Sequence, residues 1–162
     1  MREIDPHELL QRLYLRPGFL LRRAHQLSVG IFEEECRELG LTPSQYGVLT
    51  VLELAGASDQ STVARALGFD RVTTLRVVRG LEARSLLKRA AAAGHSSRRK
   101  LTLTAAGQQT LAAGRVQAER ISERLLSPLQ ADEQAQLLRL LRKLCGGLEA
   151  GARTRVVPPG GQ

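Results

Sequence analysis

The sequence has few cysteines and histidines, the residues that most often build metal sites and redox centres. Its two cysteines, Cys36 and Cys145, stand too far apart for a metal knuckle and are too few for a disulfide framework. Its three histidines, His7, His25 and His95, fall on unrelated segments. A phosphate-binding glycine loop and a nucleophile paired with a base are also missing. We therefore expect no metal, no cofactor and no catalytic activity.

Long hydrophobic runs are absent as well. No stretch approaches the ~18 apolar residues of a membrane span, and the start, Met1-Arg-Glu-Ile-Asp-Pro-His, lacks the apolar core of a signal peptide. These absences predict a cytoplasmic protein with no membrane partner. Aromatic residues make up only 3% of the chain, while leucine, alanine and arginine dominate, which favours helices. The 162 residues suit one domain, or one domain with a dimerisation layer.

Positive charge is what the sequence has in excess, and it lies in one window. Residues 65–100 contain ten basic and two acidic residues, so they carry the whole net charge of +8, and the rest of the chain is neutral. Each phosphate neutralised by lysine or arginine releases condensed counterions, which favours binding to a polyanion. The window therefore predicts a surface that meets nucleic acid.

Helix caps and hydrophobic periodicity predict a mainly α fold. N-caps are expected at Asp5, Asp59, Asp70 and Thr104, and Thr42 begins a capping box. The expected helices cover about 5–13, 18–39, 43–55, 60–67, 70–84, 104–126 and 131–148. Two short strands, 86–89 and 99–103, are joined by a small-residue and basic loop, which is typical of a β-hairpin wing.

This order predicts four parts. Residues 1–40 form N-terminal dimerisation helices, 41–104 a winged helix-turn-helix that binds DNA, and 105–149 C-terminal dimerisation helices. Residues 150–162, with Pro-Pro-Gly-Gly, are expected to be a disordered tail. The leucines of the last helix span an arc broader than one packing surface needs, which indicates a helical bundle between two copies of the chain.

The helix expected over 70–84 has two distinct faces. At 100° per residue, the buried face should hold Thr74, Val77, Val78 and Leu81. Val72, Arg76 and Arg79 then point outward together, as the second helix of a helix-turn-helix would present them to the major groove. We expect Arg76 to read a base, with edge contacts from Val72 and Thr73. The candidate phosphate contacts are Arg71, Thr74 and Arg79.

The predicted hairpin adds a second basic element after this helix. Arg98, Arg99 and Lys100 at its tip would reach the minor groove or flanking phosphates. Alternatives remain: both features could be ordinary solvated charge, or the basic surface could serve a nonspecific architectural or RNA-binding protein. Base readout predicts sequence-dependent losses on mutation, whereas an architectural role predicts equal losses on all sequences.

Four segments together resemble the MarR family of bacterial transcriptional regulators, and the resemblance covers roughly residues 17–146. They are Leu41-Thr-Pro-Ser-Gln-Tyr-Gly-Val-Leu, Gly68-Phe-Asp-Arg-Val-Thr-Thr, Gly80-Leu-Glu-Ala-Arg-Ser-Leu-Leu and Leu101-Thr-Leu-Thr-Ala-Ala-Gly. The resemblance implies a homodimer, a winged helix-turn-helix in each subunit, a palindromic double-stranded DNA operator, and commonly release by a small phenolic or aromatic acid. At the wing tip, where members show an acidic residue and then arginine two positions later, this chain has His95 and Ser97, and Arg98 or Arg99 takes that arginine's place after a one-residue shift.

The segment 16–26 resembles the first long helix of members that regulate aromatic-compound catabolism. A small aromatic carboxylate or phenolic effector would need a cation and an apolar wall. The candidates are Arg22, Arg23, His25, Gln26 and Tyr46. The alternative is that these arginines make surface or intersubunit contacts and that His25 packs on its helix. A thiol-based redox sensor on the same fold, using Cys36 or Cys145, is a further alternative.

Overall fold

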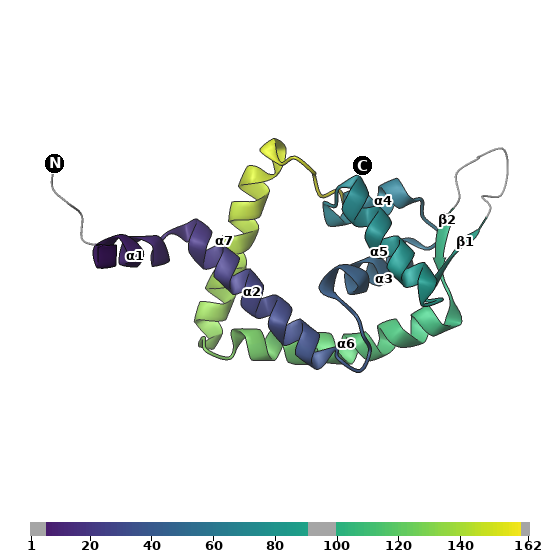
Figure 1. The fold of residues 1–162 in the computed structure, drawn as a ribbon, viewed down its shortest axis with the longest axis horizontal. Helices are drawn as coiled ribbons and strands as arrows, with labels where there is room; N and C mark the ends of the chain where they lie inside the picture. The colour runs from purple at the N-terminus through teal and green to yellow at the C-terminus, as the bar shows by residue number, and fades with distance from the viewer. Residues whose placement is uncertain (1–5, 91–99, 160–162) are drawn as a thin grey trace.

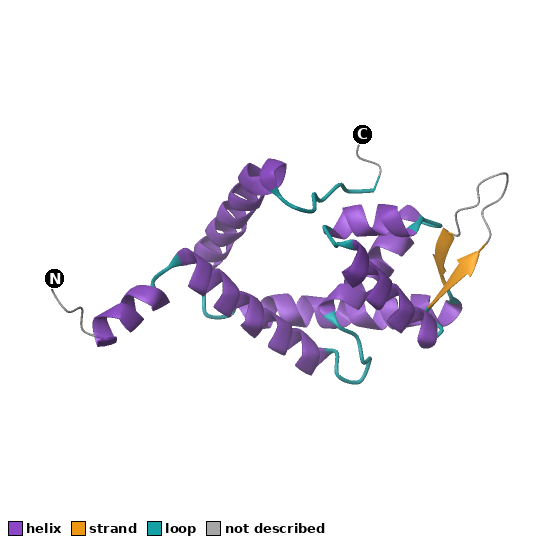
Figure 2. Cartoon of the chain, turned by 45° about the horizontal axis from the view of Figure 1, so that its top comes forward, coloured by secondary structure: helices purple, strands orange, loops and turns teal. Residues whose placement is uncertain are grey.

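The computed structural model describes residues 6–90 and 100–159, and its fold is mainly α with one small hairpin, as the sequence predicts. Figure 2 shows the two strands set at one end of an otherwise helical chain. The elements in order are α1 Pro6–Tyr14, α2 Pro17–Glu35, α3 Pro43–Ala55, α4 Gln60–Leu67, α5 Arg71–Ala83, β1 Leu87–Ala90, β2 Lys100–Leu103, α6 Ala105–Leu126, α7 Ala131–Leu148 and the 3-10 turn η1 Glu149–Gly151.

Side-chain caps set the helix starts where the sequence predicts them. Thr42 and Gln45 form the reciprocal capping box, with the backbone N–H of each donating to the other's side-chain oxygen at 3.1 and 3.3 Å. Asp59, Asp70 and Thr104 accept from backbone N–H groups three residues on, at 2.8, 2.7 and 3.0 Å. These local bonds fix the starts of α3, α4, α5 and α6.

One hydrophobic core joins α3, α4, α5, the hairpin and α6 into a single unit, which we call the lobe. Its most buried side chains have exposed fractions of 0%: Val48, Leu49, Val63, Val78, Leu81, Leu101 and Leu111. The hairpin is antiparallel with Leu87 opposite Leu103 and Ala90 opposite Lys100. A third segment joins it, because Ser58 and Leu101 exchange two backbone hydrogen bonds at 3.1 and 2.7 Å. The wing is therefore attached to the loop that precedes α4.

The second helix ends four residues earlier than the sequence predicts. α2 stops at Glu35, and residues 36–40 form turns that end at Gly40, whose φ is +57°. The Arg84 guanidinium, at the end of α5, holds the turn that follows: it donates to the carbonyl oxygens of Leu39 and Gly40, both at 2.6 Å. Those carbonyls lie 44 and 45 residues from Arg84 in sequence, so helix periodicity gave no sign of the contact.

α1, the first half of α2 and α7 form an arm outside the lobe. Figure 1 shows α7 leaving the far end of α6 and α1 extending beyond α2. None of the residues of α7 is buried, although it is rich in leucine. The large hydrophobic side chains exposed on the arm are Leu10, Leu13, Tyr14, Leu20, Leu21, Leu27, Leu137, Leu138, Leu140, Leu144 and Leu148. No other part of the described chain covers this apolar surface.

The tail differs from its predicted disorder. Residues 152–159 run back from η1 toward α4 in Figure 1 and bond to it through backbone and hydroxyl groups. Hydrogen bonds to carbonyls at the end of a helix hold the tail without any apolar periodicity, so the sequence pattern missed it. Residues 160–162 lie outside the described residues.

The described residues contain neither a candidate membrane span nor a candidate metal site. Within 6–90 and 100–159, no helix is both long and apolar enough to cross a bilayer. Across the same ranges, no group of three or more His, Cys, Asp or Glu residues is arranged to hold a metal ion.

Candidate nucleic-acid interface

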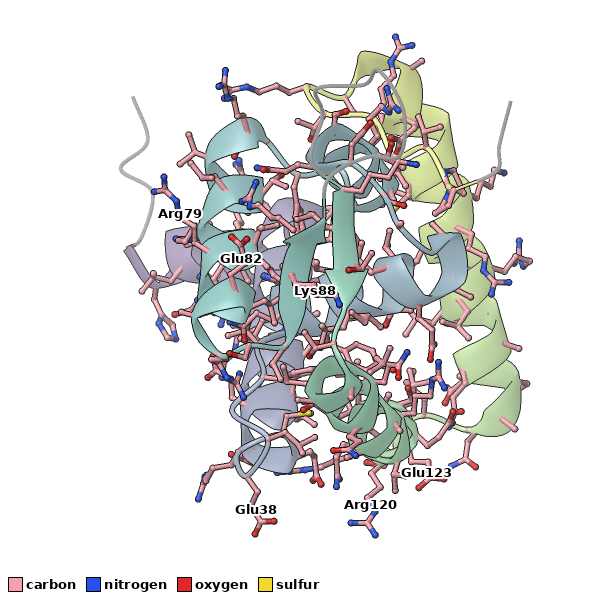
Figure 3. The ribbon with its side chains drawn as sticks, turned by 90° about the vertical axis from the view of Figure 1, so that its right-hand side faces the viewer. Glu38, Arg79, Glu82, Lys88, Arg120 and Glu123 are labelled. Atoms are coloured by element: carbon pink, nitrogen blue, oxygen red, sulfur yellow. The ribbon has the colours of Figure 1, made fainter. Side chains whose placement is uncertain are left out.

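The two faces of α5 lie as the 100° periodicity predicts. Thr74, Val77, Val78 and Leu81 are its buried residues. On the other face Val72 is 76% exposed, and Arg76 and Arg79 are exposed with it. Figure 3 shows Arg79 projecting away from the body of the lobe. Two guanidinium groups and an apolar side chain are therefore presented to solvent on one helical surface.

Thr74 is the one helix candidate that the structure removes. It is 1% exposed, and its hydroxyl donates to the backbone carbonyl of Asp70 at 2.6 Å. The prediction that Thr74 contacts phosphate is therefore wrong for this chain, because its side chain is buried and its hydroxyl hydrogen is already used. Thr73 is half-buried beside it, and its backbone N–H is bound to the Asp70 carboxylate at 2.7 Å.

Asp70 holds the N-terminal end of α5 in place. The pKa of its carboxyl is lowered, chiefly because the backbone and side chain of Thr73 donate hydrogen bonds to it, and Arg153 adds a favourable charge. A lowered folded-state pKa means that this contribution to stability is complete above the unfolded-state pKa and is lost as pH falls through the folded value. At neutral pH the cap is therefore fully charged.

A hollow of about 470 Å³ lies between α4 and the start of α5. It is lined by Gln60, Ser61, Ala64, Arg65, Arg71, Thr74 and Leu75. Arg65 and Arg71 are both exposed, so two cations border an open depression beside the N-terminus of α5. A helix N-terminus and flanking guanidinium groups favour a negatively charged oxygen, such as that of a phosphate.

Two arginines of the basic window have structural contacts that sequence reasoning missed. Arg84 binds the carbonyls that end the α2 turn. Arg89 on β1 donates to both carboxylate oxygens of Glu82 on α5, at 2.6 and 3.0 Å, and this bond raises the pKa of Arg89. The pair links the wing to α5. In the sequence, the indication of this ion pair was Glu82, one of only two acidic residues in the window.

The remaining described cations of the window are all exposed. Figure 3 labels two of them, Arg79 on α5 and Lys88 on β1. The full set is Arg65, Arg71, Arg76, Arg79, Lys88 and Lys100. Arg98 and Arg99, the other predicted wing contacts, lie outside the described residues. The last turn of α4, the N-terminal end and outward face of α5 and the base of the wing thus carry the exposed basic residues.

The effector candidates fall into two groups. Arg22, Arg23, His25 and Gln26 are exposed along α2, where the Arg22 guanidinium lies 4.9 Å from the Phe19 ring centroid. Tyr46 on α3 is half-buried, and its ring centroid lies 5.9 Å from that of Phe32. Gln26 and Phe32 are separated by about 9 Å along the helix. A single subunit therefore does not bring Tyr46 together with the four α2 residues.

Cys36 lies in the core rather than at a reactive surface. It is 1% exposed, and burial, with a smaller effect from Glu35, raises the pKa of its thiol. A neutral buried thiol is a poor nucleophile. Cys145 is exposed on α7.

We expect Cys36 in the native protein to react with iodoacetamide at least about tenfold more slowly than in the urea-unfolded chain, because the thiolate is disfavoured and enclosed. Mass spectrometry of the alkylated peptides measures both rates. Peroxide treatment should correspondingly leave DNA binding unchanged. A peroxide response that disappears in the Cys36→Ser variant would instead support the redox-sensor alternative.

The comparisons with known proteins agree with this architecture. The profile of the MarR family matches residues 39–96. The chain is 33% identical to the HTH-type transcriptional repressor NicR of Pseudomonas putida over 127 residues, which cover 78% of this chain and 80% of NicR.

Two solved structures extend the comparison to three dimensions. One is Bordetella bronchiseptica BpsR, described as regulated in DNA binding by 6-hydroxynicotinic acid, with 31% identity, a TM-score of 0.75 and coverage of 81% of this chain and 94% of that one. The other is the transcriptional repressor CouR bound to a 23-mer DNA duplex, with 28% identity, a TM-score of 0.76 and coverage of 89% and 99%. The chain therefore belongs to the MarR family of transcriptional regulators.

Proposed function

We propose that this regulator is a homodimeric repressor that binds a palindromic operator in the cytoplasm and leaves it when a small aromatic or phenolic acid binds. The observation that carries the proposal is the outward face of α5, where Val72, Arg76 and Arg79 are exposed above a fully buried opposite face. NicR and CouR are both transcriptional repressors, and CouR is bound to a DNA duplex. These relatives support the DNA-binding and repressor roles.

The recognition helix would enter the major groove with its N-terminal turns against the bases. Arg76 suits bidentate binding to guanine, Val72 suits contact with a thymine methyl, and Thr73 lies at the edge of the helix. Arg71 and Arg79 would bind phosphates on either side. Lys100, with Arg98 and Arg99 beyond it, would reach the adjacent minor groove or its phosphates.

The dimer would form through the arm. Its exposed leucines cannot be covered within the described chain, and a second copy offers the same apolar surface under two-fold symmetry. Two lobes related in this way would place their recognition helices in successive major grooves. The half-sites are then expected about 10 bp apart, centre to centre.

The effector would act on the spacing of the two lobes. α2 connects the arm to the lobe, so a ligand beside it that prefers one lobe position shifts the population toward that position, by no more than its differential affinity for the two states. Arg22 and Arg23 can supply the cation, His25 and Gln26 hydrogen bonds, and Tyr46 an apolar wall if the partner subunit completes the site. The regulation of BpsR by 6-hydroxynicotinic acid supports this effector class.

Titration of the purified protein against duplex DNA from upstream of its own gene tests the proposal. At several salt concentrations, log K should fall linearly with log salt, and competitor DNA of unrelated sequence should bind at least about a thousandfold more weakly. Adding 6-hydroxynicotinate or hydroxybenzoates should release the duplex. A flat salt response, or equal affinity for every duplex, contradicts the proposal.

Arg76→Ala should weaken binding to the preferred duplex by about 1 to 3 kcal/mol in each half-site and leave binding to unrelated duplexes nearly unchanged, because the variant removes a bond to a base and keeps the bonds to phosphates. Competition binding with both duplexes measures the difference. Arg120→Ala on α6 is the matched control, since Figure 3 shows Arg120 projecting from a different part of the molecule than Arg79. Equal losses on all sequences would favour the nonspecific architectural alternative.

A further inference from the structure

The tail forms a defined strap over the helix-turn-helix. We use "strap" for residues 152–157, which leave η1 and cross to the turn between α4 and α5 (Figure 1). The hydroxyl of Thr154 donates to the carbonyl of Gly68 at 2.6 Å, and the backbone N–H of Val157 donates to the carbonyl of Arg65 at 2.8 Å. Both acceptors are carbonyls at the C-terminal end of α4, where the last helical carbonyls lack the usual partner four residues on. The Arg65 carbonyl also accepts from the N–H of Gly68, at 3.4 Å.

Packing at the turn adds to these bonds. Gly68 has φ +64°, a left-handed conformation that favours glycine. Because glycine has no Cβ, the strap can lie close to its Cα. A Cβ placed at Gly68 would lie 3.0 Å from the Val156 side chain. Glu149 holds the other side of the strap, because its carboxylate accepts from the backbone N–H of Val156. The strap is therefore seated closely against the turn that precedes the recognition helix.

The charged groups of the strap are two arginines. Arg153 and Arg155 are exposed, and residues 150–162 contain no acidic residue. Arg155 donates to the carbonyl of Ala150 at 2.8 Å, which orients its guanidinium beside η1. Arg153 lies near Asp70, the N-cap of α5, whose pKa it lowers in addition to the larger effect of the Thr73 hydrogen bonds. The fold thus brings Arg153 from far along the sequence to the N-terminal end of the recognition helix, where Thr154 is bonded to Gly68, and places Arg155 on the same strap beside η1.

The position of the strap leaves the reading face free. Val72 is 76% exposed, and Arg76 and Arg79 are exposed, with the strap in place. A segment that blocked DNA would have to cover those side chains. The strap instead lies to one side of them and carries the same sign of charge, which suits DNA backbone flanking the groove that α5 enters.

We propose that Arg153 and Arg155 of the strap form an additional phosphate-contact site, which binds the DNA backbone beside the N-terminus of the recognition helix. The inference rests on the proposed DNA-binding function and extends its surface beyond residues 65–100. Because phosphate contacts carry no sequence information, the site adds affinity for every duplex and no selectivity.

The test compares Arg153→Ala/Arg155→Ala with Arg37→Ala/Arg120→Ala, a control that removes two exposed arginines from the turn after α2 and from α6. Binding to the preferred and to an unrelated duplex is measured at several salt concentrations. The strap variant should weaken both alike and reduce the slope of log K against log salt by about 3.6 for the dimer, or about 0.9 for each of the four phosphates that are no longer neutralised. The control should leave the slope unchanged.

A second variant, Thr154→Val, keeps both arginines and removes the hydroxyl that binds Gly68. It should weaken binding to both duplexes by a smaller factor, because the arginines are less well placed. An unchanged salt slope in the strap variant, or tighter binding by either variant, overturns the inference while wild-type binding stands. A wild-type protein that fails to bind DNA overturns the proposed function itself.

Discussion

Gly107→Ala is expected to lower the free energy of unfolding by about 3 kcal/mol, the upper part of the range for overpacking a close-packed site. Gly107 lies in the first turn of α6 and is buried. An added Cβ would overlap the carbonyl oxygen of Leu86 and lie 3.0 Å from its carbonyl carbon. The neighbour is backbone, so no side-chain rotation can relieve the overlap.

Leu86 cannot move away cheaply. Its N–H donates to the carbonyl of Leu81 at 3.0 Å, and its carbonyl accepts from the N–H of Thr104 at 3.2 Å. Its side chain is 5% exposed in the core. Separating α6 from Leu86 would therefore break hydrogen bonds and core packing where the wing begins.

Urea unfolding followed by circular dichroism measures the loss. Gly30→Ala on α2 is the control, since nothing lies within 4 Å of its Cβ position and alanine is the better helix former. It should stabilise the protein, by up to about 1 kcal/mol. Equal urea midpoints for Gly107→Ala and the wild type would show that α6 and Leu86 are not packed against each other in this way.

The parts of the fold that sequence reasoning predicted are those fixed by neighbours in the chain. Caps at Thr42, Asp59, Asp70 and Thr104 act over three residues, so helix starts could be predicted from the sequence. The buried face of α5 follows from the helical period alone. The same period predicts that Thr74 lies on the buried face, and it is buried in the structure. Because it is buried, Thr74 cannot be the phosphate contact that was also predicted for it.

The parts that sequence reasoning missed depend on contacts across the fold. Arg84 and Arg89 count as free positive charge in the sequence, but one ends the α2 turn and the other pairs with Glu82. Residues 150–162, with Pro-Pro-Gly-Gly, are predicted to be disordered, yet the strap within them is held by the carbonyls of Arg65 and Gly68. The effector candidates remain a prediction, because their grouping depends on how the two subunits meet.

The largest effect on DNA binding is expected from the arm, not from the recognition helix. Leu144→Glu should separate the proposed dimer and reduce operator binding at least about a hundredfold. Leu144 is 44% exposed on α7 and, with Leu140 and Leu148, lines an open apolar hollow. A carboxylate buried at this position would lack a partner and would replace apolar contact, at a cost of about 3 kcal/mol for each subunit.

The two-fold symmetry of the proposed dimer doubles this cost. About 6 kcal/mol in total corresponds to a dimer dissociation constant raised by about four powers of ten. A monomer then binds one half-site without the effective concentration that the second lobe provides, which accounts for the weaker binding. Analytical ultracentrifugation and DNA titration on the same samples measure the two effects together.

Ala135→Glu is the matched control, because it places the same charge on the opposite side of α7. Ala135 lies about 180° from Leu144 at 100° per residue and is exposed. This variant should remain dimeric and keep its affinity for the operator. If Leu144→Glu also sediments as a dimer, the leucine face of α7 does not form the interface. If instead it is monomeric and binds as tightly as the wild type, two lobes are not needed, and the palindromic operator loses its physical basis.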